Sequence, residues 1–468
     1  MEHLNTFVTL LNDFLYGKFL ITLLIVCGLT FTIATRCVQL RLFLEIFRVL
    51  FEKKKGKNDV SSFQALMVST ASRVGTGNIV GVSAAICLGG FGAVPWMWLI
   101  AMLGMASAFA ETVLAQIFKK KSDKGAFGGP AYYIEFLTKN RLIPLLFILA
   151  LISTFMVGFN MLASYNIQDS FSGFDFYNKD TSPIYIGLIL TTVVGYVLLG
   201  GGERIIKFAT LLVPFMGLIY ISISAFVVFN NIEYLPEMFK RMFSEAFDFQ
   251  AIFGGFTGSC VMYGIKRALF SNEAGMGSAP NAAGCADVSH PVKQGLVQVF
   301  SVFLDTMIIC TATALMCLSS GIEPSAELNG VPYVLKVAES AFGSYGNIII
   351  AITITLFAFT TIIGNLFYVD KSFFYIFRTV PNKSFFLIYR LFATFIVMIG
   401  ALLSSDLLWG IADITMGCMA LINVVTIVLL SKYVVGALKD YQEQKKQGLD
   451  PHFKASSIGL EGQTDYWK

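Results

Sequence analysis

The sequence predicts an all-α integral membrane protein with eleven transmembrane helices, arranged as one extra N-terminal helix followed by a 5+5 inverted repeat. Three observations predict this class. Of the 468 residues, 56% are hydrophobic and only 14% are charged, with a mean hydropathy of +0.70, whereas soluble proteins carry about 25% charged residues. The apolar runs are about 20 residues long, which is typical of helices and not of the strands of a membrane barrel. Two of the runs are interrupted by glycines at corresponding places in the two repeats.

The apolar runs define the predicted helices in order. They cover residues 17–35, 62–89, 92–118, 145–171, 182–200, 205–229, 247–270, 291–319, 345–374, 384–403 and 409–432. The predicted division is an N-terminal helix with an amphipathic surface linker (1–61), a first repeat (62–229), a second, inverted repeat (247–432) and a cytoplasmic tail (433–468). The tail is polar and is expected to be poorly ordered.

Charge orients these helices. With the N-terminus outside, the cytoplasmic segments and adjoining helix ends carry 28 of the 34 Lys and Arg residues, including Lys266 and Arg267, while the outer segments carry five and Arg73 lies within a helix. This asymmetry follows the positive-inside rule. It predicts a multi-pass protein in the inner (plasma) membrane of a bacterium or archaeon, with the C-terminus in the cytoplasm. The net charge of +4 follows from this topology, so the expected partner is the lipid bilayer and not a nucleic acid.

The run 62–89 contains ASRVGTGNIVGV at residues 71–82. Its three glycines would let the helix unwind near its midpoint, and non-helical backbone at membrane depth is tolerated only where it is buried or lines a cavity. Freed N–H groups suit a carboxylate, and freed carbonyls suit a cation. Close helix packing through small residues is the alternative, but it does not explain Arg73 and Asn78 beside the glycines.

A second interruption, GGFTGS, occupies residues 254–259 within the run 247–270. Counted from the run 62–89, this run is the first helix of the second five. Five is odd, so the second repeat is inverted relative to the first. Interrupted helices at corresponding places of inverted halves predict the binding site of a secondary transporter. The small and polar residues of 267–298 are expected to form a tightly packed inner loop near helix ends.

Several motifs together resemble the alanine or glycine:cation symporter family. They are RVGTGNIVGV at 73–82, FAE at 109–111, GGPAYYI at 128–134, SNEAGMGSAP at 271–280 and FLDTMIICTATAL at 303–315. The resemblance spans about residues 60–430. It implies a leucine-transporter-like fold with broken first and sixth core helices, and inward symport of a small neutral amino acid with Na+ or sometimes H+. Alanine or glycine is the expected cargo, with D-alanine also considered.

The resemblance also implies where substrate and ion bind. The substrate carboxylate is expected to meet the first break, and the ammonium is expected to meet carbonyls freed at the second. The substrate-binding residues are then Thr76, Gly77, Asn78, Gly254, Gly255, Phe256, Gly258, Ser164 and Asn365. The sodium ligands implied are Val74, Gly75, Thr360 and Thr361. For Phe256, core packing is the alternative to a lid, and Thr hydroxyls in membrane helices usually bond back to their own helix.

Ionisable side chains inside a bilayer are functional candidates. Arg73 requires an anionic partner, and Glu111, Glu273 and Asp305 are the candidates. One such pair is expected to act as an inner gate or as a structural ion pair. Any of the three carboxylates could instead accept a coupling proton, but sodium is preferred because the two threonines need no titratable group.

Two departures from the family pattern bear on the cargo. Many members carry Gly-Trp where this chain has Gly364 and Asn365, and a Gln-x-Asn motif where it reads ASYN at 163–166. Asn in place of Trp makes room and adds hydrogen-bonding capacity, which would admit serine or glutamine.

Two other classes of function are less consistent with the sequence. A membrane-embedded enzyme would need a catalytic motif such as HExxH or GxSxG, which is absent, so no enzyme is expected. A channel would more commonly show a filter loop or rings of charge. The eight Cys and three His residues do not show the spacing of a metal site or of disulfides.

Overall fold

The computed structural model describes residues 10–12, 14–52, 60–122, 125–248 and 259–467. Within them, nine helices are long and apolar enough to cross a membrane, or ten when the bent pair Ser62–Arg73 and Gly77–Gly89 counts as one span. These ten correspond to ten of the eleven apolar runs. The seventh run, 247–270, is described only from residue 259 onward, so the count of eleven stays a prediction.

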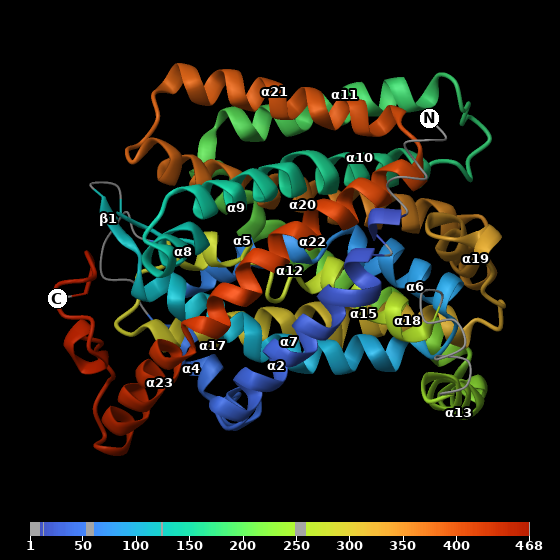
Figure 1. The fold of residues 1–468 in the computed structure, drawn as a ribbon. Coiled ribbons are helices and arrows are strands. Elements are labelled where there is room, and N and C mark those ends of the chain that lie inside the picture. Colours follow the sequence, from blue (N-terminus) through green and yellow to red (C-terminus); the bar gives the residue numbers. More distant parts are fainter. Residues whose placement is uncertain (1–9, 13, 53–59, 123–124, 249–258, 468) are drawn as a thin grey trace.

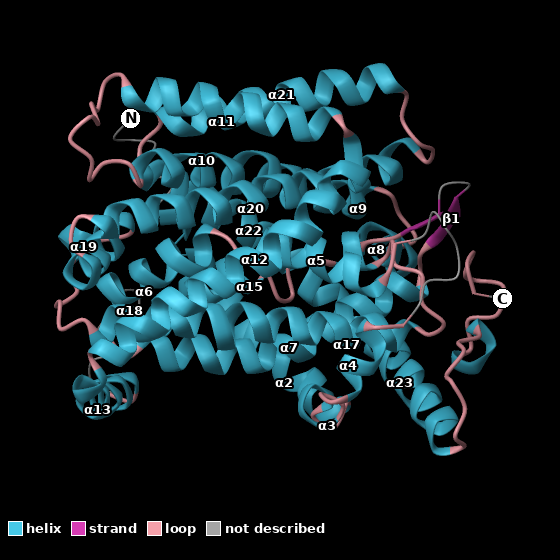
Figure 2. Cartoon of the chain, turned by 180° about the vertical axis from the view of Figure 1, so that it is seen from behind, coloured by secondary structure: helices cyan, strands magenta, loops and turns pink. Residues whose placement is uncertain are grey.

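The chain is helical almost throughout (Figure 2), and η marks its π-helical and 3-10 turns. The first half contains η1 Leu15–Leu20, α2 Ile21–Ala34, α3 Val38–Arg41, α4 Glu45–Leu50, α5 Ser62–Arg73, η2 Gly77–Gly81, α6 Val82–Gly89, α7 Ala93–Ile117, β1 Lys120–Ser122, β2 Gly125–Phe127, α8 Pro130–Thr138, α9 Leu142–Ile152, η3 Ser153–Gly158, α10 Phe159–Asp169, α11 Ser182–Leu199, α12 Gly201–Asn230, η4 Ile232–Tyr234 and α13 Leu235–Ala246. The second half contains α15 Cys260–Asn272, α16 Pro280–Ala283, α17 Pro291–Val302, η6 Phe303–Cys310, α18 Thr311–Ser319, η7 Ala326–Leu328, α19 Val331–Phe342, α20 Tyr345–Phe377, α21 Lys383–Leu402, α22 Ser405–Leu429, α23 Ser431–Lys446 and η8 Ala455–Ile458. The two short strands pair antiparallel.

Two groups of long helices enclose the interrupted segments (Figure 1). On one side α7 packs against α17 and α15, and on the other α10 and α11 pack against α21. The helix α5 contacts α20 and α12, while α15 contacts α7 and α6. The segments α5, η2 and α15 therefore lie in the middle of the molecule, where all the side chains of η2 are buried.

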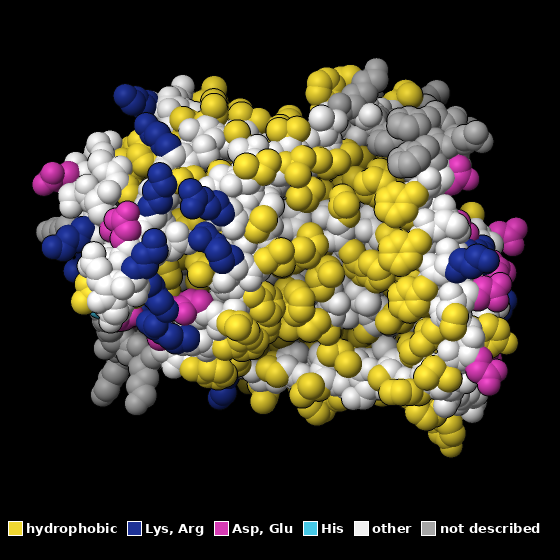
Figure 3. All heavy atoms as spheres, turned by 90° about the horizontal axis from the view of Figure 1, so that it is seen from below, with side chains coloured by type: hydrophobic (Ala, Val, Ile, Leu, Met, Phe, Trp, Pro, Cys, Tyr) yellow, Lys and Arg dark blue, Asp and Glu magenta, His cyan; other side chains and the backbone are white. Residues whose placement is uncertain are grey.

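Apolar side chains cover the outside of the protein as well as its core. On the outer helices α11, α12 and α21, the side chains of Ile189, Leu211, Phe229 and Ile388 are between 67% and 71% exposed. On another face, a hydrophobic band lies between two charged ends: Lys and Arg gather at one end with some Asp and Glu among them, and Asp and Glu with some Lys and Arg lie at the other (Figure 3). This distribution is expected when lipid solvates the middle of the molecule and water its ends.

The basic end, as we call it, is the end formed by β1, α8, α23 and the chain after α23.

Two residues that the charge count placed on the cytoplasmic side lie elsewhere. Lys266 and Arg267 are buried within α15, where their side-chain nitrogens lie 2.7 Å and 3.3 Å from the carboxylate of Asp413. They belong to a buried ion cluster, because a charge at this depth requires a partner.

The chain after α23 is docked on the basic end. Trp467 Nε1 donates to the carbonyl of Gln116 at 2.7 Å, and Lys119 Nζ lies 3.9 Å from the ring centroid of Tyr466. Further back, the backbone N–H of Phe453 donates to the carbonyl of Ser289 at 2.9 Å. The expectation of a poorly ordered tail is therefore wrong up to residue 467. The polar composition misled because aromatic residues near the end of the chain supply the contacts.

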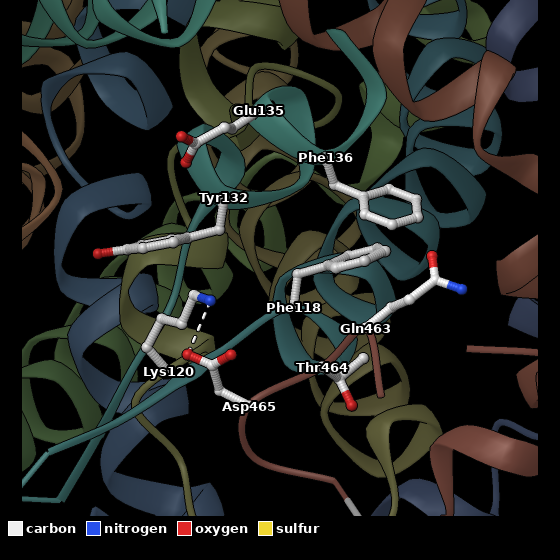
Figure 4. Close-up of a pocket in the computed structure, with 8 residues that line it drawn as sticks. All are labelled: Phe118, Lys120, Tyr132, Glu135, Phe136, Gln463, Thr464 and Asp465. Atoms are coloured by element: carbon white, nitrogen blue, oxygen red, sulfur yellow. Dashed lines mark ion pairs between the residues drawn. The ribbon is translucent and has the colours of Figure 1, made fainter. Parts of the chain in front are cut away.

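A small cavity of about 180 Å³ lies where this tail meets α8 and the end of α7 (Figure 4). Its lining residues are Phe118, Lys120, Tyr132, Glu135, Phe136, Gln463, Thr464 and Asp465. Lys120 and Asp465 form an ion pair at 2.7 Å across it. This cavity is part of the tail's docking surface and lies apart from the interrupted helices.

Replacing the tail's last aromatic anchor should release the tail locally. Trp467→Ala removes a side chain that is 8% exposed together with its hydrogen bond. The free energy of local opening should fall by roughly 3 kcal/mol, the lower end for truncating a buried Trp. Hydrogen exchange of residues 450–467 measures this. Leu449→Ala is the control, since that side chain is 53% exposed, and unchanged exchange in Trp467→Ala would contradict the docked arrangement.

Candidate substrate and cation site

The first interruption lies where the sequence predicts it. The helix α5 begins with a reciprocal capping box between Ser61 and Gln64 and ends at Arg73. Val74 leaves the helical conformation with ψ of 89°, and the chain resumes after a 51° bend. The backbone N–H of Gly75 donates to Asn78 Oδ1 at 2.7 Å. The side chain of Asn78 therefore satisfies a backbone N–H of the break from within η2.

A buried loop follows α15, within the stretch SNEAGMGSAP. Glu273, Gly275 and Gly277 have positive φ angles of 53°, 83° and 80°, and Pro280 then starts the short helix α16. The whole stretch is buried. The prediction of a tightly packed loop near helix ends is therefore confirmed for this stretch. Two glycines permit the left-handed backbone that follows α15.

The second break predicted from sequence, at Gly254, Gly255, Phe256 and Gly258, lies outside the described residues. An aromatic side chain of α15, Phe270, lies against the first break instead. A Cβ on Gly77 would come within 2.9 Å of the Phe270 ring. The same ring has Phe159 at 4.6 Å and Trp409 at 4.8 Å between centroids. These three rings wall the break.

The first break and the buried loop after α15 are joined by direct hydrogen bonds. Ser72 Oγ lies 2.9 Å from Glu273 Oε1, and Ser278 Oγ donates to Glu273 Oε2 at 2.6 Å. Asp305, in η6, accepts from Asn78 Nδ2 at 2.7 Å. The first break, the loop after α15 and η6 therefore form a buried polar centre.

Asp305 connects three elements. Besides Asn78, its carboxylate accepts hydrogen bonds from the hydroxyls of Ser271 and Thr306, both at 2.8 Å. Its side chain is fully buried. A buried carboxylate with several donors is satisfied without a counter-ion. Asp305 thus ties the first break to α15 and η6.

Arg73 has no carboxylate partner in this conformation. Its Nη1 donates to Gln298 Oε1 at 2.8 Å, and none of the ion pairs within 4.0 Å in the described parts of the chain includes it. Its Nε and Nη2 are buried and lack a hydrogen-bond partner there. Glu111, one of the proposed partners, accepts instead from the Gly277 N–H at 2.9 Å and Asn423 Nδ2 at 2.8 Å.

The two threonines proposed as cation ligands differ in environment. Thr361 Oγ1 is buried without a hydrogen-bond partner among the described residues, and a Cβ on Gly75 would overlap it. Thr360 Oγ1 instead donates to the carbonyl of Phe357 at 2.9 Å in its own helix. Hydroxyl oxygen beside unwound backbone is the donor set that suits Na+. Thr361 Oγ1 lies against the break at Gly75, whereas the Thr360 hydroxyl bonds within its own helix while its oxygen keeps lone pairs, and both threonines stay predicted ligands.

Two further residues predicted to bind substrate, Ser164 and Asn365, differ from each other in their distance from the first break. Ser164 Oγ donates to the carbonyl of Val397 in α21 at 2.7 Å, away from the breaks. Asn365 lies beside the first break, because its Oδ1 is 2.5 Å from Ser72 Oγ and its Nδ2 donates to Asn160 Oδ1 at 2.8 Å. Asn160 belongs to α10 and was not singled out from the sequence.

A model of the sodium:alanine symporter family matches residues 1–455. This chain belongs to the sodium:alanine symporter family.

Relatives along the full length support the assignment. The probable sodium/glutamine symporter GlnT of Bacillus subtilis is 42% identical over 469 residues, which cover 100% of this chain and 96% of GlnT. The amino-acid carrier protein AlsT of the same organism is 40% identical to this chain, over an alignment that covers 99% of this chain and 98% of AlsT. The sodium/alanine symporter AgcS of Methanococcus maripaludis is 35% identical, with 94% and 97% covered. These names are all of transporters.

A solved structure gives the fold. The crystal structure of MhsT in complex with L-phenylalanine has a TM-score of 0.56, covering 88% of this chain and 93% of that one, at 15% identity. This symporter family member is therefore a multi-pass membrane protein with the leucine-transporter-like fold.

Three residues that sequence reasoning missed take part in the polar centre of this symporter: Ser72, Ser271 and Asn160. For the first two a signal existed, because Ser72 lies within ASRVGTGNIVGV and Ser271 is the first residue of SNEAGMGSAP, two motifs that were singled out from the sequence. For Asn160 there was none, since it lies in a continuous apolar helix and only packing brings it to Asn365.

Proposed function

We propose that this chain imports a small neutral amino acid together with Na+. Alanine or glycine, including D-alanine, is the cargo first expected from sequence, and serine and glutamine are the alternatives that Asn365 favours. The observation that carries the proposal is the buried first break with the Thr361 hydroxyl against it, which has no hydrogen-bond partner among the described residues. The name of GlnT adds support for glutamine, and that of AgcS for alanine.

In this proposal the substrate lies between the two breaks. Its carboxylate meets backbone N–H groups at Thr76 and Gly77, while Asn78 shapes the break through its bonds to Gly75 and Asp305. Its ammonium meets the carbonyls predicted to be freed at residues 254–258, which lie outside the described residues. Glu273, in the buried loop after α15, supplies a negative group beside Ser72 at the end of α5.

The sodium ion is held by Thr361 Oγ1 and by carbonyls at Val74 and Gly75. Binding of the ion would order the backbone of the first break and thereby raise the affinity for the substrate. Ion binding and substrate binding are then thermodynamically coupled. Proton coupling through Glu111, Glu273 or Asp305 is the alternative. It has some support in the name of a relative, a putative sodium/proton-dependent alanine carrier of Bacillus subtilis.

Gating is proposed to use Arg73. Arg73 Nε and Nη2 have no hydrogen-bond partner among the described residues. A movement of α5 that brings the guanidinium to Glu111, Glu273 or Asp305 would therefore form a buried ion pair. The basic end is proposed to face the cytoplasm of a bacterium or archaeon, with the N-terminus outside, because Lys and Arg gather there (Figure 3).

Uptake by reconstituted protein tests the proposal. Proteoliposomes with an inward sodium gradient, a proton gradient or neither would be supplied with labelled alanine, and unlabelled glycine, D-alanine, serine and glutamine would compete. We expect saturable accumulation that requires the sodium gradient. Uptake driven by the proton gradient alone would show that H+ and not Na+ is the coupling ion. Non-saturable flux without any gradient would favour a channel.

A further inference from the structure

A buried pair of amides links α10 to α20 beside the first break. Asn160 and Asn365 are both fully buried, and Asn365 Nδ2 donates to Asn160 Oδ1 at 2.8 Å. Asn365 Oδ1 lies 2.5 Å from Ser72 Oγ, and Ser72 also lies 2.9 Å from Glu273 Oε1. The pair therefore ends a chain of polar contacts that runs from Glu273 through Ser72 and Asn365 to Asn160 in α10.

This approach of the helices depends on a glycine. A Cβ on Gly364 would lie 2.7 Å from the backbone nitrogen of Ser72, so α20 contacts α5 backbone to backbone there. The next residue of α20, Asn365, is thereby held against the last turn of α5. The amide pair is positioned by main-chain packing and not by flexible side chains alone.

One amide atom of Asn160 remains unpaired. Its Nδ2 is buried and has no hydrogen-bond partner in the described part of the chain. Turning both amides by 180° would let Asn160 Nδ2 donate to Asn365 Oδ1, and Asn160 Oδ1 would then be the atom left over. Either orientation leaves one buried polar atom of Asn160 unsatisfied, and such an atom costs free energy until a ligand or water pairs with it.

We propose that Asn160, together with Asn365, selects a neutral amino acid whose side chain itself forms hydrogen bonds, a carboxamide or a hydroxyl, over one with a methyl group. This rests on the proposed function and defines its cargo. A carboxamide or hydroxyl both donates and accepts, so it pairs with Asn160 in either orientation. An alanine methyl would bury the unpaired atom, and sites built around a polar contact discriminate strongly against analogues that lack it.

Competition between cargoes tests the proposal. In sodium-driven uptake by wild-type proteoliposomes, kcat/KM for glutamine or serine should exceed that for alanine by at least roughly tenfold. In Asn160→Leu, which keeps similar volume without a polar group, that ratio should fall at least roughly tenfold while alanine uptake stays within a few-fold. Comparing glutamine with serine distinguishes the carboxamide from the hydroxyl.

The chain offers a matched control. Asn166 lies six residues further along α10 and also has a buried Nδ2 without a hydrogen-bond partner, and among the described residues its side chain forms no hydrogen bond to α20 or to the first break. Asn166→Leu should leave the ratio of cargoes unchanged. If both variants changed the ratio equally, the effect would belong to the helix and the proposal would be overturned.

Failure of this proposal is distinguishable from failure of the proposed function. An unchanged ratio in Asn160→Leu with intact sodium-driven uptake overturns the role of Asn160 alone, whereas no sodium-driven uptake of any amino acid by the wild type overturns the symport. If Asn160→Leu does not transport, thermal unfolding of Asn160→Ala with added glutamine, serine or alanine gives the same comparison, since ligand binding raises the unfolding midpoint. Equal shifts for all three in wild type and variant would overturn the proposal.

Discussion

Gly75→Ala is expected to abolish uptake, with a loss of at least about a hundredfold. A Cβ at this position would overlap Thr361 Oγ1 and lie 2.9 Å from Thr361 Cβ. Both atoms belong to a helix whose backbone is packed against α5 at Gly364, so α20 has no room to withdraw. Overpacking of this kind costs about 1–3 kcal/mol and would displace the backbone proposed to bind the ion.

Gly81 is the matched control for this substitution. It lies six residues further along, at the end of η2, and a Cβ there would meet the Phe270 ring at 3.7 Å and Trp409 at 3.9 Å, which are ordinary contacts. Gly81→Ala should therefore keep uptake within a few-fold of wild type and match or exceed its stability. Equal uptake by Gly75→Ala and wild type would show that the first break is not part of the transport site.

Thr361→Ala is expected to raise the sodium concentration that gives half-maximal uptake by at least about tenfold. The hydroxyl has no protein partner within the described residues, so removing it leaves no protein donor or acceptor newly unpaired, and thermal stability without sodium should change by less than about 1 kcal/mol. The loss should therefore appear in sodium dependence alone. Uptake at a series of sodium concentrations, with unfolding measured in parallel, checks both parts.

Thr360→Ala tests whether the neighbouring threonine also contributes to sodium binding. The atoms nearest to a Cβ at Gly75 all belong to Thr361 and not to Thr360, so Thr360→Ala should leave the sodium dependence within about twofold. The double variant Gly75→Ala/Thr361→Ala adds a sharper comparison. It removes the overlap with Oγ1 but leaves the two Cβ atoms 2.9 Å apart, so stability should be restored only in part and sodium dependence should not be restored. Unaltered sodium dependence in Thr361→Ala would place the cation elsewhere.

The helices and the first break could be predicted from sequence because both depend on local composition. Apolar runs of about 20 residues need no tertiary information, and Gly75, Gly77 and Gly81 lower helix propensity wherever they occur. The family could be recognised for the same reason, since its motifs are continuous in the chain.

The second predicted break, at residues 254–258, lies outside the described residues and stays a prediction. SNEAGMGSAP is rich in the residues that loops use, and the structure confirms the packed loop predicted for it. Only packing shows that this loop is buried and that Glu273, directly after α15, lies beside Ser72.

The sequence by itself determined the membrane class, the order of helices, the first break and the family. Tertiary structure alone decided which polar groups meet: Thr361 and not Thr360 at the break, Gln298 and not a carboxylate at Arg73, and Asn160 at Asn365. The physical reason is the helical period. Adjacent side chains on a helix point about 100° apart, and which of them faces a partner distant in the chain depends on how the helices are rotated in the packed bundle.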